Sequence, residues 1–254
     1  MDVPQSDLKI GENVDIKPHT TFGVGGFAKY FVEVDKAKDA IEAIGLAKSK
    51  NISHLIIAGG SNLVFNDGVL DFFIIKVKTP KLFSITGEAI DTIKDYISLS
   101  DNEITCDAGV TLMDLITFSL DHGLSGLEAL SGIPGSVGGA IAGNAGAYGQ
   151  TVSGPLVSIE IFNGREIEVL SKEECKFKYR DSLIKRKPWV VLSVKFQLEP
   201  GDREALQQKS KEIIETRNKK YSPEIKCPGS FFKNILIDDV PSTSLKFLPK
   251  DRDY

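Results

Sequence analysis

The stretch SGIPGSVGGAIAGNAGAYG, residues 131–149, contains seven glycines and no charged side chain. A linker of this length is usually rich in Ser, Lys or Glu, whereas here glycine alternates with Ala, Ile and Val. This composition suits burial against a flat partner, yet buried backbone needs partners for its N–H and C=O groups. Two explanations fit: a phosphate-bearing ligand laid along the chain, or close packing of a helix on a sheet through small residues.

A second glycine-rich turn, AGGSN at 58–62, follows the short apolar strand predicted for HLIIA at 54–58. Glycine lets the backbone approach a ligand closely, and successive N–H groups can bind an anion. A tight turn closed by a Ser or Asn cap is the structural alternative. Taken together with residues 131–149, this turn favours a ligand site.

A third stretch, GVGGFA at 23–28, matches the dinucleotide-binding pattern G-x-G-x-x-A. That pattern must follow a strand and open a helix, but here it follows KPHTTF and precedes YFVEV at 30–34, which we expect to be a strand. We therefore reject a Rossmann site. No GxxxxGK(S/T) occurs in the sequence, so we expect no P-loop.

Length, charge and cysteine use limit the class of protein. The chain has 254 residues, enough for one large or two ordinary domains, and its net charge of −4 argues against a broad nucleic-acid surface. The three cysteines lie far apart without a CxxC, and the three histidines lack ligand spacing, so we expect neither a metal site nor a disulfide framework. A reducing compartment fits best, and the N-terminus lacks signal-peptide features, so we expect a cytoplasmic protein.

Residues 129–159 carry no charge and are numerous enough to cross a bilayer. They also include Pro134, Asn144, Gln150 and many glycines, which make the stretch too polar and too broken for a transmembrane helix. We therefore expect no membrane insertion.

Hydrophobic periodicity predicts a mixture of α and β elements. Helices are expected at 38–50, at 203–220 with a polar, amphipathic pattern, and at 111–123 with Thr111 as N-cap and Gly123 as C-cap. Strands are expected at 30–34, 54–58, 72–77, 103–109 and, half-buried, at 189–199, with a hairpin of 155–163 and 165–170 around Gly164. PGD at 200–202 is the expected boundary between segments.

Two further blocks carry candidate chemistry. FKYRDS at 177–182 places Arg180 after an aromatic residue, and an arginine fork can bind a carboxylate or phosphate. CPGSFFKN at 227–234 places Ser230 beside two phenylalanines and a lysine, a setting that can tune proton transfer. A solvated arginine and a capping serine are the structural alternatives. Because G-x-S-x-G is absent, Ser230 is not a hydrolase nucleophile elbow.

Together these blocks resemble the UDP-N-acetylenolpyruvoylglucosamine reductases, the MurB family of peptidoglycan synthesis. The resemblance follows the chain in order over nearly all of its length, and its third and fifth blocks are the specific ones. The blocks are HTTFGVGG (19–26), AGGSNLV (58–64), GLEALSGIPGSVGGAIAGNAGAYG (126–149), YRDS (179–182) and GSFFKN (229–234).

The resemblance implies an α+β fold with a two-lobed FAD-binding domain of the PCMH or vanillyl-alcohol-oxidase type at 1–200, with lobes of about 1–80 and 81–200. An incomplete C-terminal substrate domain would occupy 201–254. FAD would be bound noncovalently, with backbone amides approaching its pyrophosphate. The implied FAD-binding residues are Ala58, Gly59, Gly60, Ser61, Asn62, Leu63, Ser131, Pro134, Gly135, Ser136, Gly139, Gly143 and Gly146.

The implied reaction has two halves, in which NADPH reduces the flavin and the flavin then delivers hydride to enolpyruvyl-UDP-GlcNAc, giving UDP-N-acetylmuramate. Hydride addition pushes negative charge onto the substrate carboxylate, which Arg180 would stabilise. Ser230 would donate the proton, in a polarised setting because free serine is a poor acid. Tyr148, Lys233 and Asn234 would contact the UDP-sugar substrate.

Three positions depart from the family pattern. Ala58 replaces the first glycine of the family's GGGSN, and Ile235 stands where proline is usual. Family members also use a catalytic glutamate well beyond the serine block, but no glutamate follows Glu224 here. We therefore expect either a fragment or a protein that has lost that part, with the fragment favoured. In both cases we expect the chain to bind FAD yet turn over slowly or not at all.

Two other functions stay open. A PCMH-type FAD oxidase of a sugar or alcohol often attaches its flavin to a histidine, but His19, His54 and His122 lie outside the glycine-rich stretches. That hypothesis also leaves GSFFKN unexplained. A noncatalytic flavin- or nucleotide-binding protein is the other alternative, supported by the absent glutamate.

Overall fold

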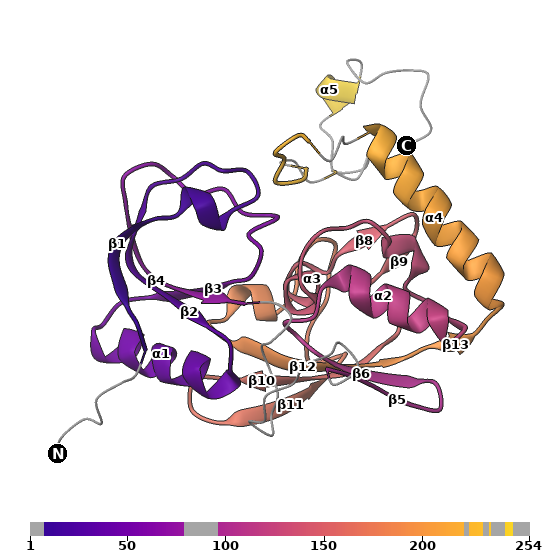
Figure 1. The fold of residues 1–254 in the computed structure, drawn as a ribbon, viewed down its shortest axis with the longest axis horizontal. Helices are drawn as coiled ribbons and strands as arrows, with labels where there is room; N and C mark the ends of the chain where they lie inside the picture. The colour runs from indigo at the N-terminus through magenta and orange to yellow at the C-terminus, as the bar shows by residue number, and fades with distance from the viewer. Residues whose placement is uncertain (1–7, 79–95, 221–223, 231–233, 235–241, 246–254) are drawn as a thin grey trace.

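Two larger β-sheets with helices packed on them, and two small two-stranded sheets, form the described part of the molecule, in keeping with the predicted mixture of α and β elements (Figure 1). The structure, a computed structural model, describes residues 8–78, 96–220, 224–230, 234 and 242–245. The first sheet is built from strands within residues 11–77 and the second from strands within residues 97–197.

The first sheet has the strand order β1-β2-β4-β3, in which β1 is antiparallel to β2 and β4 is parallel to both of its neighbours. Its strands are β1 (Gly11–Asp15), β2 (Phe27–Val34), β3 (His54–Ile57) and β4 (Val69–Val77). Helix α1 (Ala37–Ser49) connects β2 to β3 and buries an apolar face against the sheet. The stretch GVGGFA runs into β2, so the prediction that it opens no helix is confirmed.

Gly26 is required by a close backbone contact. A Cβ atom there would lie 1.8 Å from the carbonyl oxygen of Gly68. Phe27 N donates a hydrogen bond to the same oxygen at 2.7 Å. The dinucleotide-like pattern therefore has a structural reason, which is to let residue 68 pair with the start of β2.

The second sheet is antiparallel, in the order β11-β10-β12-β6-β5. Its strands are β5 (Ile97–Ser100), β6 (Glu103–Asp107), β10 (Leu156–Phe162), β11 (Ile167–Ser171) and β12 (Val190–Gln197). The predicted hairpin is confirmed, with Gly164 at a φ of 96° between β10 and β11. The predicted half-burial of 189–199 holds only from residue 195 onward, where buried and more exposed positions alternate. Every position from 190 to 194 is buried, because the strand is central in the sheet and helix α3 packs on it.

Helix α2 (Leu112–Asp121) begins where the sequence predicts. The Thr111 hydroxyl accepts a hydrogen bond from Asp114 N at 3.1 Å and so caps the first turn. The helix ends at Asp121 with His122 as its C-cap, and Gly123 follows in the left-handed region with a φ of 67°. The predicted glycine thus terminates the helix one position further on.

The glycine-rich stretch folds into a short helix, α3 (Val137–Gly143), which packs on β12, so the helix-on-sheet explanation of its glycines applies here. The Ser136 hydroxyl accepts a hydrogen bond from Gly139 N at 3.2 Å at its start. Asn144, in the left-handed region, closes its end. The remaining short elements are η1 (Lys17–His19), β7 (Leu124–Ser125), η3 (Glu128–Leu130), β8 (Gly146–Ala147), β9 (Gln150–Thr151), η4 (Ile184–Arg186), β13 (Glu199–Pro200) and α5 (Ser242–Leu245).

Helix α4 (Arg203–Lys220) has the predicted bounds and runs along the outer edge of the molecule (Figure 1). Its buried side chains are Leu206 and Ser210. Polar contacts supply much of the attachment; Ser210 Oγ lies 2.7 Å from Oγ of the buried Ser131. A helix with so little apolar surface depends on such contacts for its position.

One apolar core extends through both sheets and helices α1, α2 and α3. A smaller cluster lies on the first sheet, and Leu63 and Phe65 pack against it from the loop after β3. Its buried members are Ile16, Ala28, Phe31, Ile57 and Ile74. This cluster fixes the loop that carries AGGSN.

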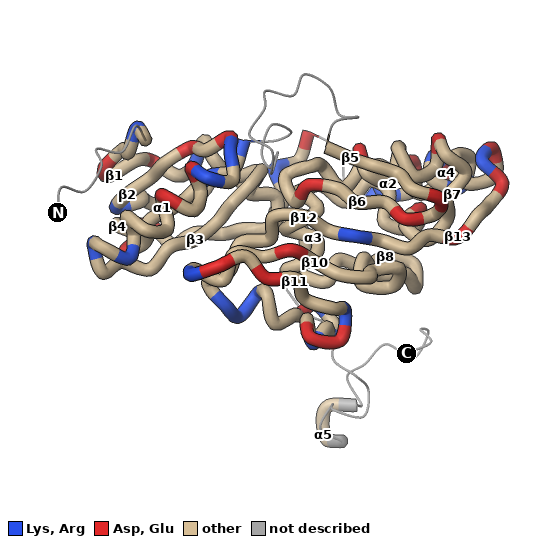
Figure 2. Tube along the Cα trace, turned by 90° about the horizontal axis from the view of Figure 1, so that it is seen from below, with Lys and Arg blue, Asp and Glu red and all other residues tan. Residues whose placement is uncertain are grey.

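Charged residues of both signs are interspersed along the trace in Figure 2. Among the residues that the structure describes, no helix is both long enough and apolar enough to cross a membrane. The glycine-rich stretch itself forms α3 and the short strand β8 rather than one long helix.

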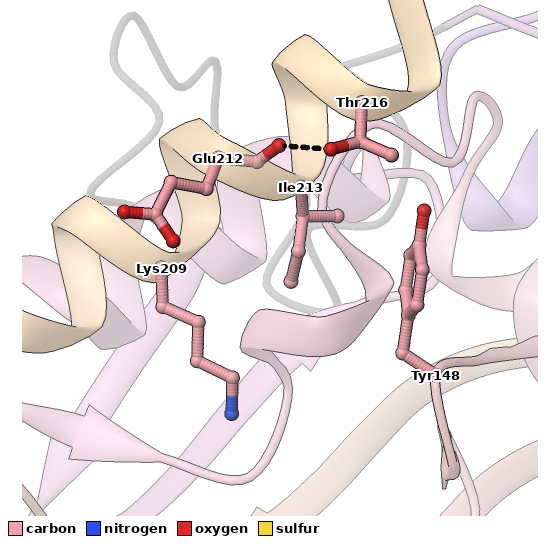
Figure 3. A pocket seen from close by; sticks show the side chains of 5 residues that line it. All are labelled: Tyr148, Lys209, Glu212, Ile213 and Thr216. Carbon is pink, nitrogen blue, oxygen red and sulfur yellow. Dashed lines mark hydrogen bonds between the residues drawn. The ribbon is translucent and has the colours of Figure 1, made fainter. Parts of the chain in front are cut away.

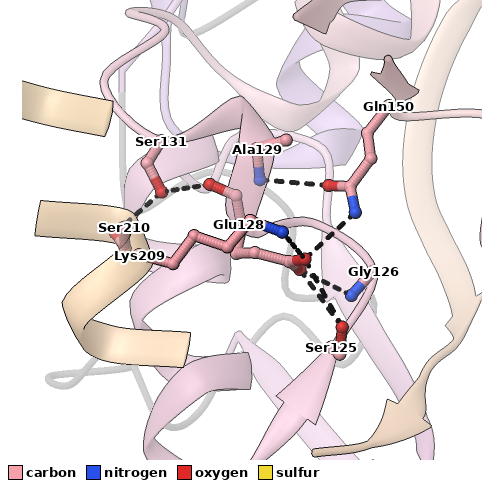
Figure 4. Close-up of polar contacts among 8 residues, drawn as sticks. All are labelled: Ser125, Gly126, Glu128, Ala129, Ser131, Gln150, Lys209 and Ser210. Atoms are coloured by element: carbon pink, nitrogen blue, oxygen red, sulfur yellow. Dashed lines mark hydrogen bonds and ion pairs between the residues drawn. The ribbon is translucent and has the colours of Figure 1, made fainter. Parts of the chain in front are cut away.

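Glu128 is buried and charged, with 3% of its side chain exposed. Its carboxylate accepts hydrogen bonds from Gly126 N at 2.8 Å, from Gln150 Nε2 at 3.0 Å and from Lys209 Nζ at 3.0 Å (Figure 4). Burial acts to raise the pKa of this carboxyl, but these donors outweigh it and lower the pKa to about 2.

Replacing Glu128 should therefore change the pH dependence of stability. The folded-state pKa lies below the ordinary 4.5, so the ionised group stabilises the fold above pH 4.5, and this contribution is lost as the pH falls toward 2. We expect Glu128→Gln to lower the Tm at neutral pH. The difference in Tm between the variant and the wild type should shrink as the pH falls from about 6 to about 3. Calorimetry over this range tests the prediction, with exposed Glu199→Gln as control. A gap that does not change with pH would contradict it.

Candidate active site

The loop 58–62 is held from one side by the HTTF block. Thr21 N donates to the Gly60 carbonyl at 3.2 Å, and Thr21 Oγ1 donates to the Gly59 carbonyl at 3.4 Å. Gly60 has a φ of 61°, and a Cβ atom there would lie 2.5 Å from the His19 carbonyl oxygen. Close packing against residues 19–21 therefore sets the conformation of this loop.

The same loop meets the glycine-rich stretch, although 73 positions separate them in sequence. Ser61 Oγ donates to the Pro134 carbonyl at 3.2 Å. A Cβ atom at Gly135 would lie 2.9 Å from that hydroxyl. The two segments that the sequence analysis assigns to one ligand thus lie together.

Both explanations for the glycine content apply, at different positions. Gly138 serves packing, since a Cβ atom there would lie 3.0 Å from Ala108 Cβ. Gly59 and Gly143 face open space, with no described atom within 4 Å of an added Cβ. Gly139 meets one side-chain oxygen, at 3.4 Å. These three open glycines leave bare backbone on which a ligand can lie.

The YRDS block is bonded to the end of α3 and to the turn after it. Ser182 Oγ donates to the Ala142 carbonyl at 2.8 Å, and Arg180 Nη2 donates to the Gly146 carbonyl at 2.6 Å. In the opposite direction, Asn144 Nδ2 donates to the Lys178 carbonyl at 2.9 Å. These bonds join the third and fourth blocks of the sequence.

Backbone strain is concentrated at this junction. Asn144, Tyr148 and Arg180 adopt left-handed conformations, with φ values of 44°, 48° and 54°. Such residues cost on the order of 1–3 kcal/mol each and tend to cluster at ligand sites. Asn144 Oδ1 is also buried without a hydrogen-bond partner in the described structure. A ligand that donates a hydrogen bond there would remove that cost.

A cavity of about 340 Å³ opens beside the junction, between the turn after α3 and the last turns of α4. Its lining includes three cationic side chains and no acidic one, so it suits an anionic ligand. The lining residues are Gly146, Ala147, Tyr148, Arg180, Thr216, Arg217 and Lys220.

A neighbouring cavity of about 300 Å³ shares Tyr148 and Thr216 with the first. Figure 3 shows the Tyr148 ring standing across from Ile213 and Thr216 of α4. Lys209 and Glu212 complete the lining. Tyr148, 58% exposed, thus forms a wall common to both cavities.

Comparison with known proteins identifies the family. Residues 28–160 match the FAD binding domain family. The UDP-N-acetylenolpyruvoylglucosamine reductases of Solibacter usitatus and Clostridium kluyveri are 33% and 35% identical to this chain. The matches cover 96% and 89% of this chain and 73% and 70% of those relatives. This chain belongs to the UDP-N-acetylenolpyruvoylglucosamine reductase family.

Solved structures agree with the family assignment. The crystal structure of the UDP-N-acetylenolpyruvylglucosamine reductase from Thermus caldophilus matches with a TM-score of 0.67 and 27% identity, over 90% of this chain and 75% of that one. A cholesterol oxidase from B. sterolicum, 16% identical, matches with a TM-score of 0.52 over 79% and 39% of the two chains and shows the fold alone. The predicted α+β fold with a PCMH-type FAD-binding domain is confirmed.

The residues present fit the FAD that this family and domain indicate. A dinucleotide needs backbone it can approach closely, and Gly59, Gly139 and Gly143 leave such backbone open. Ser131, also predicted to bind FAD, is buried beside α4, and its hydroxyl donates to the Glu128 carbonyl at 2.7 Å. Its role and the roles of the other predicted FAD-binding residues, which lie on the loop 58–63 and along 134–146, stay predictions.

The two predicted catalytic residues lie in different parts of the described chain. Arg180 donates to the backbone carbonyl groups of residues 144 and 146. Ser230 is exposed and follows Gly229, which lies close to the loop 58–62. A Cβ atom added at Gly229 would lie 3.3 Å from Asn62 Oδ1. Within the described residues no hydrogen bond or ion pair joins Ser230 to Arg180. Asn234 is exposed, and Lys233 lies outside the described residues.

Several site residues have no signal in the sequence patterns. Thr21 is one: the HTTF block contains it, but no local pattern indicates its bond to Gly59, which lies 38 positions away. Arg217 and Lys220 are two others, because the sequence of α4 predicts only an ordinary polar helix. Within the described ranges, no three His, Cys, Asp or Glu side chains group as a metal site.

Thr21 should support FAD binding without touching the ligand. Thr21→Val removes the hydroxyl that bonds to Gly59 and keeps the side-chain shape, so loop 58–62 loses one restraint. A single hydrogen bond of this kind contributes about 0.5–1.5 kcal/mol, which predicts FAD binding weaker by roughly two- to tenfold. Flavin fluorescence titration measures this, with Thr21→Ser, which retains the hydroxyl, as the matched control. Equal affinities for Thr21→Val and Thr21→Ser would count against the role.

Proposed function

We propose that this protein reduces the enolpyruvyl group of UDP-N-acetyl-3-O-(1-carboxyvinyl)glucosamine to UDP-N-acetylmuramate, a step of peptidoglycan synthesis, with NADPH as reductant and FAD as cofactor. The names of its relatives support this reaction. The observation that carries the proposal is the cationic cavity next to the turn that follows the open glycines. We assign residues 1–200 to FAD binding and 201–254 to the start of a substrate domain.

The substrate carries a carboxylate and a diphosphate, and the cavity supplies the opposite charge. We assign the carboxylate to Arg180, whose planar fork matches carboxylate geometry. Its Nη2 is already bonded to the Gly146 carbonyl, so the guanidinium is oriented before a ligand arrives. Arg217 and Lys220 would face the diphosphate. Tyr148, Lys233 and Asn234 are proposed as further substrate contacts.

The net reaction adds one hydride and one proton across the enolpyruvyl double bond. FAD, when bound, supplies the hydride transfer. Arg180 would stabilise the negative charge that develops on the substrate carboxylate. Ser230 would then give its hydroxyl proton to the neighbouring carbon and recover it from solvent. Because Ser230 is exposed in the described structure, bound substrate must screen it from water for this transfer to be efficient.

A visible spectrum of the purified chain, before and after NADPH and then substrate, tests the function. We expect flavin absorbance near ~450 nm that bleaches with NADPH and recovers when the enolpyruvyl substrate is added. Protein that bleaches but is not reoxidised by substrate would contradict turnover by this chain. Protein that takes up no added FAD would overturn the cofactor, and flavin that stays attached after acid precipitation would favour the oxidase alternative.

Ser230→Ala should affect one half of the reaction. Flavin reduction by NADPH should proceed at the wild-type rate, whereas reoxidation by substrate should slow by about 10²–10⁴-fold, the usual contribution of a general acid. Stopped-flow absorbance separates the two rates. Cys227→Ser, on the same segment, is the control for local disturbance. Wild-type reoxidation by Ser230→Ala would exclude Ser230 as the proton donor.

A further inference from the structure

The cavity has two walls that come from distant parts of the chain. One wall is the turn that contains Tyr148, and the other consists of Thr216, Arg217 and Lys220 near the end of α4. The spacing between these walls determines whether Tyr148, Arg180 and the α4 cations can contact one ligand together. Something must therefore fix α4 relative to the turn.

Glu128 is bonded to one residue beside each wall. Its Oε1 accepts from Gln150 Nε2 at 3.0 Å and from Lys209 Nζ at 3.0 Å (Figure 4). Gln150 follows the Tyr148 turn directly, and its Oε1 accepts in turn from Ala129 N at 3.0 Å. Lys209 precedes Thr216 by two helical turns and so lies on the same side of α4.

The attachment of α4 is mostly polar, which makes this contact important for its position. Among its side chains, Leu206 and Ser210 are buried. The Glu128 side chain is 3% exposed, whereas Lys209 is 52% exposed. A carboxylate so deeply buried is destabilised strongly when a partner is lost, so the carboxylate holds its donors in place.

We propose that Glu128 is a positioning residue that sets the distance between the Tyr148 turn and the cationic end of α4, and thereby tunes affinity for the diphosphate. The inference rests on the proposed function for the identity of the ligand. Glu128 itself lines neither cavity, so its effect is transmitted through Gln150 and Lys209.

Two substitutions disrupt the contacts that join Glu128 to Gln150 and Lys209, each at a different point. In Glu128→Gln, the new amide can still accept from Gly126 N, but its NH₂ group faces donors on Lys209 and Gln150. Lys209→Gln removes the ion pair and leaves the other bonds to Glu128, so it keeps the test usable if Glu128→Gln folds poorly. Lys211→Gln removes an equal charge from an exposed position of α4 and is the matched control.

The experiment measures UDP binding by calorimetry on FAD-loaded protein, together with FAD affinity and hydrogen exchange. We expect UDP to bind about tenfold to a hundredfold more weakly in Glu128→Gln and at least severalfold more weakly in Lys209→Gln, because small misplacements of binding groups are costly. FAD affinity should be unchanged in both variants, and Lys211→Gln should match the wild type throughout. Exchange should accelerate in both 146–151 and 213–220.

The readouts distinguish a positioning role from a merely structural one. Equal losses of UDP and FAD affinity, or exchange that accelerates only in 124–130, would overturn the inference. Wild-type UDP affinity in both Glu128→Gln and Lys209→Gln would overturn it as well. If the wild type binds no UDP, the proposed ligand is wrong. The positioning role is then tested by hydrogen exchange alone: faster exchange in both 146–151 and 213–220 supports it, and unchanged exchange in either segment overturns it.

Discussion

The glycine-rich stretch must satisfy its buried backbone on one side while leaving the other side bare. It does so by bonding to the turn between β6 and α2: Val137 N donates to Val110 O at 2.8 Å, Gly138 N to Ala108 O at 2.8 Å, and Leu112 N to Gly135 O at 2.9 Å. These bonds need no side chains on the stretch itself. The absence of side chains is what admits Ser61 on one flank and leaves Gly143 open.

The position of Arg180 follows from the same stretch. Its guanidinium bonds to carbonyl groups at Gly146 and Asn144, which lie just after α3 ends. An arginine fork has five donors, so two such bonds orient the group and leave others for a ligand. The left-handed conformation of Arg180 costs energy that these contacts offset. The strain and the bonds together indicate that its orientation matters more than its local stability.

The sequence predicts elements whose cause is local and misses those whose cause is distant. The Thr111 cap, the hairpin at Gly164 and helix α4 follow from patterns within a few residues, and the structure confirms them. The burial of every position from 190 to 194 in β12 could not be predicted, because it depends on which strands become its neighbours.

For a related reason, the sequence indicates helix α3 as one of two explanations and gives no bounds for it. Glycine disfavours a helix by about 1 kcal/mol per residue relative to alanine, so local propensity argues against helix in VGGAIAG. The Ser136 cap and the backbone bonds to residues 108 and 110 stabilise it nonetheless. The site blocks could be found by resemblance, but their mutual contacts could not. Thr21 and Glu128 reach partners 38 and 81 positions away, and no local pattern marks such residues.

The polar character of α4 has a physical explanation once its place beside the cavity is known. A helix that presents cations to an anionic ligand cannot bury that face in an apolar core. The carbonyl end of a helix also carries partial negative charge, which would repel an anion. Arg217 and Lys220, both in that last turn and both lining the cavity, place positive charge at this end of the helix. Attachment then has to come from elsewhere on the helix, and the contacts of Lys209 and Ser210 supply it. The weak apolar pattern of α4 is thus consistent with its position beside the cationic cavity.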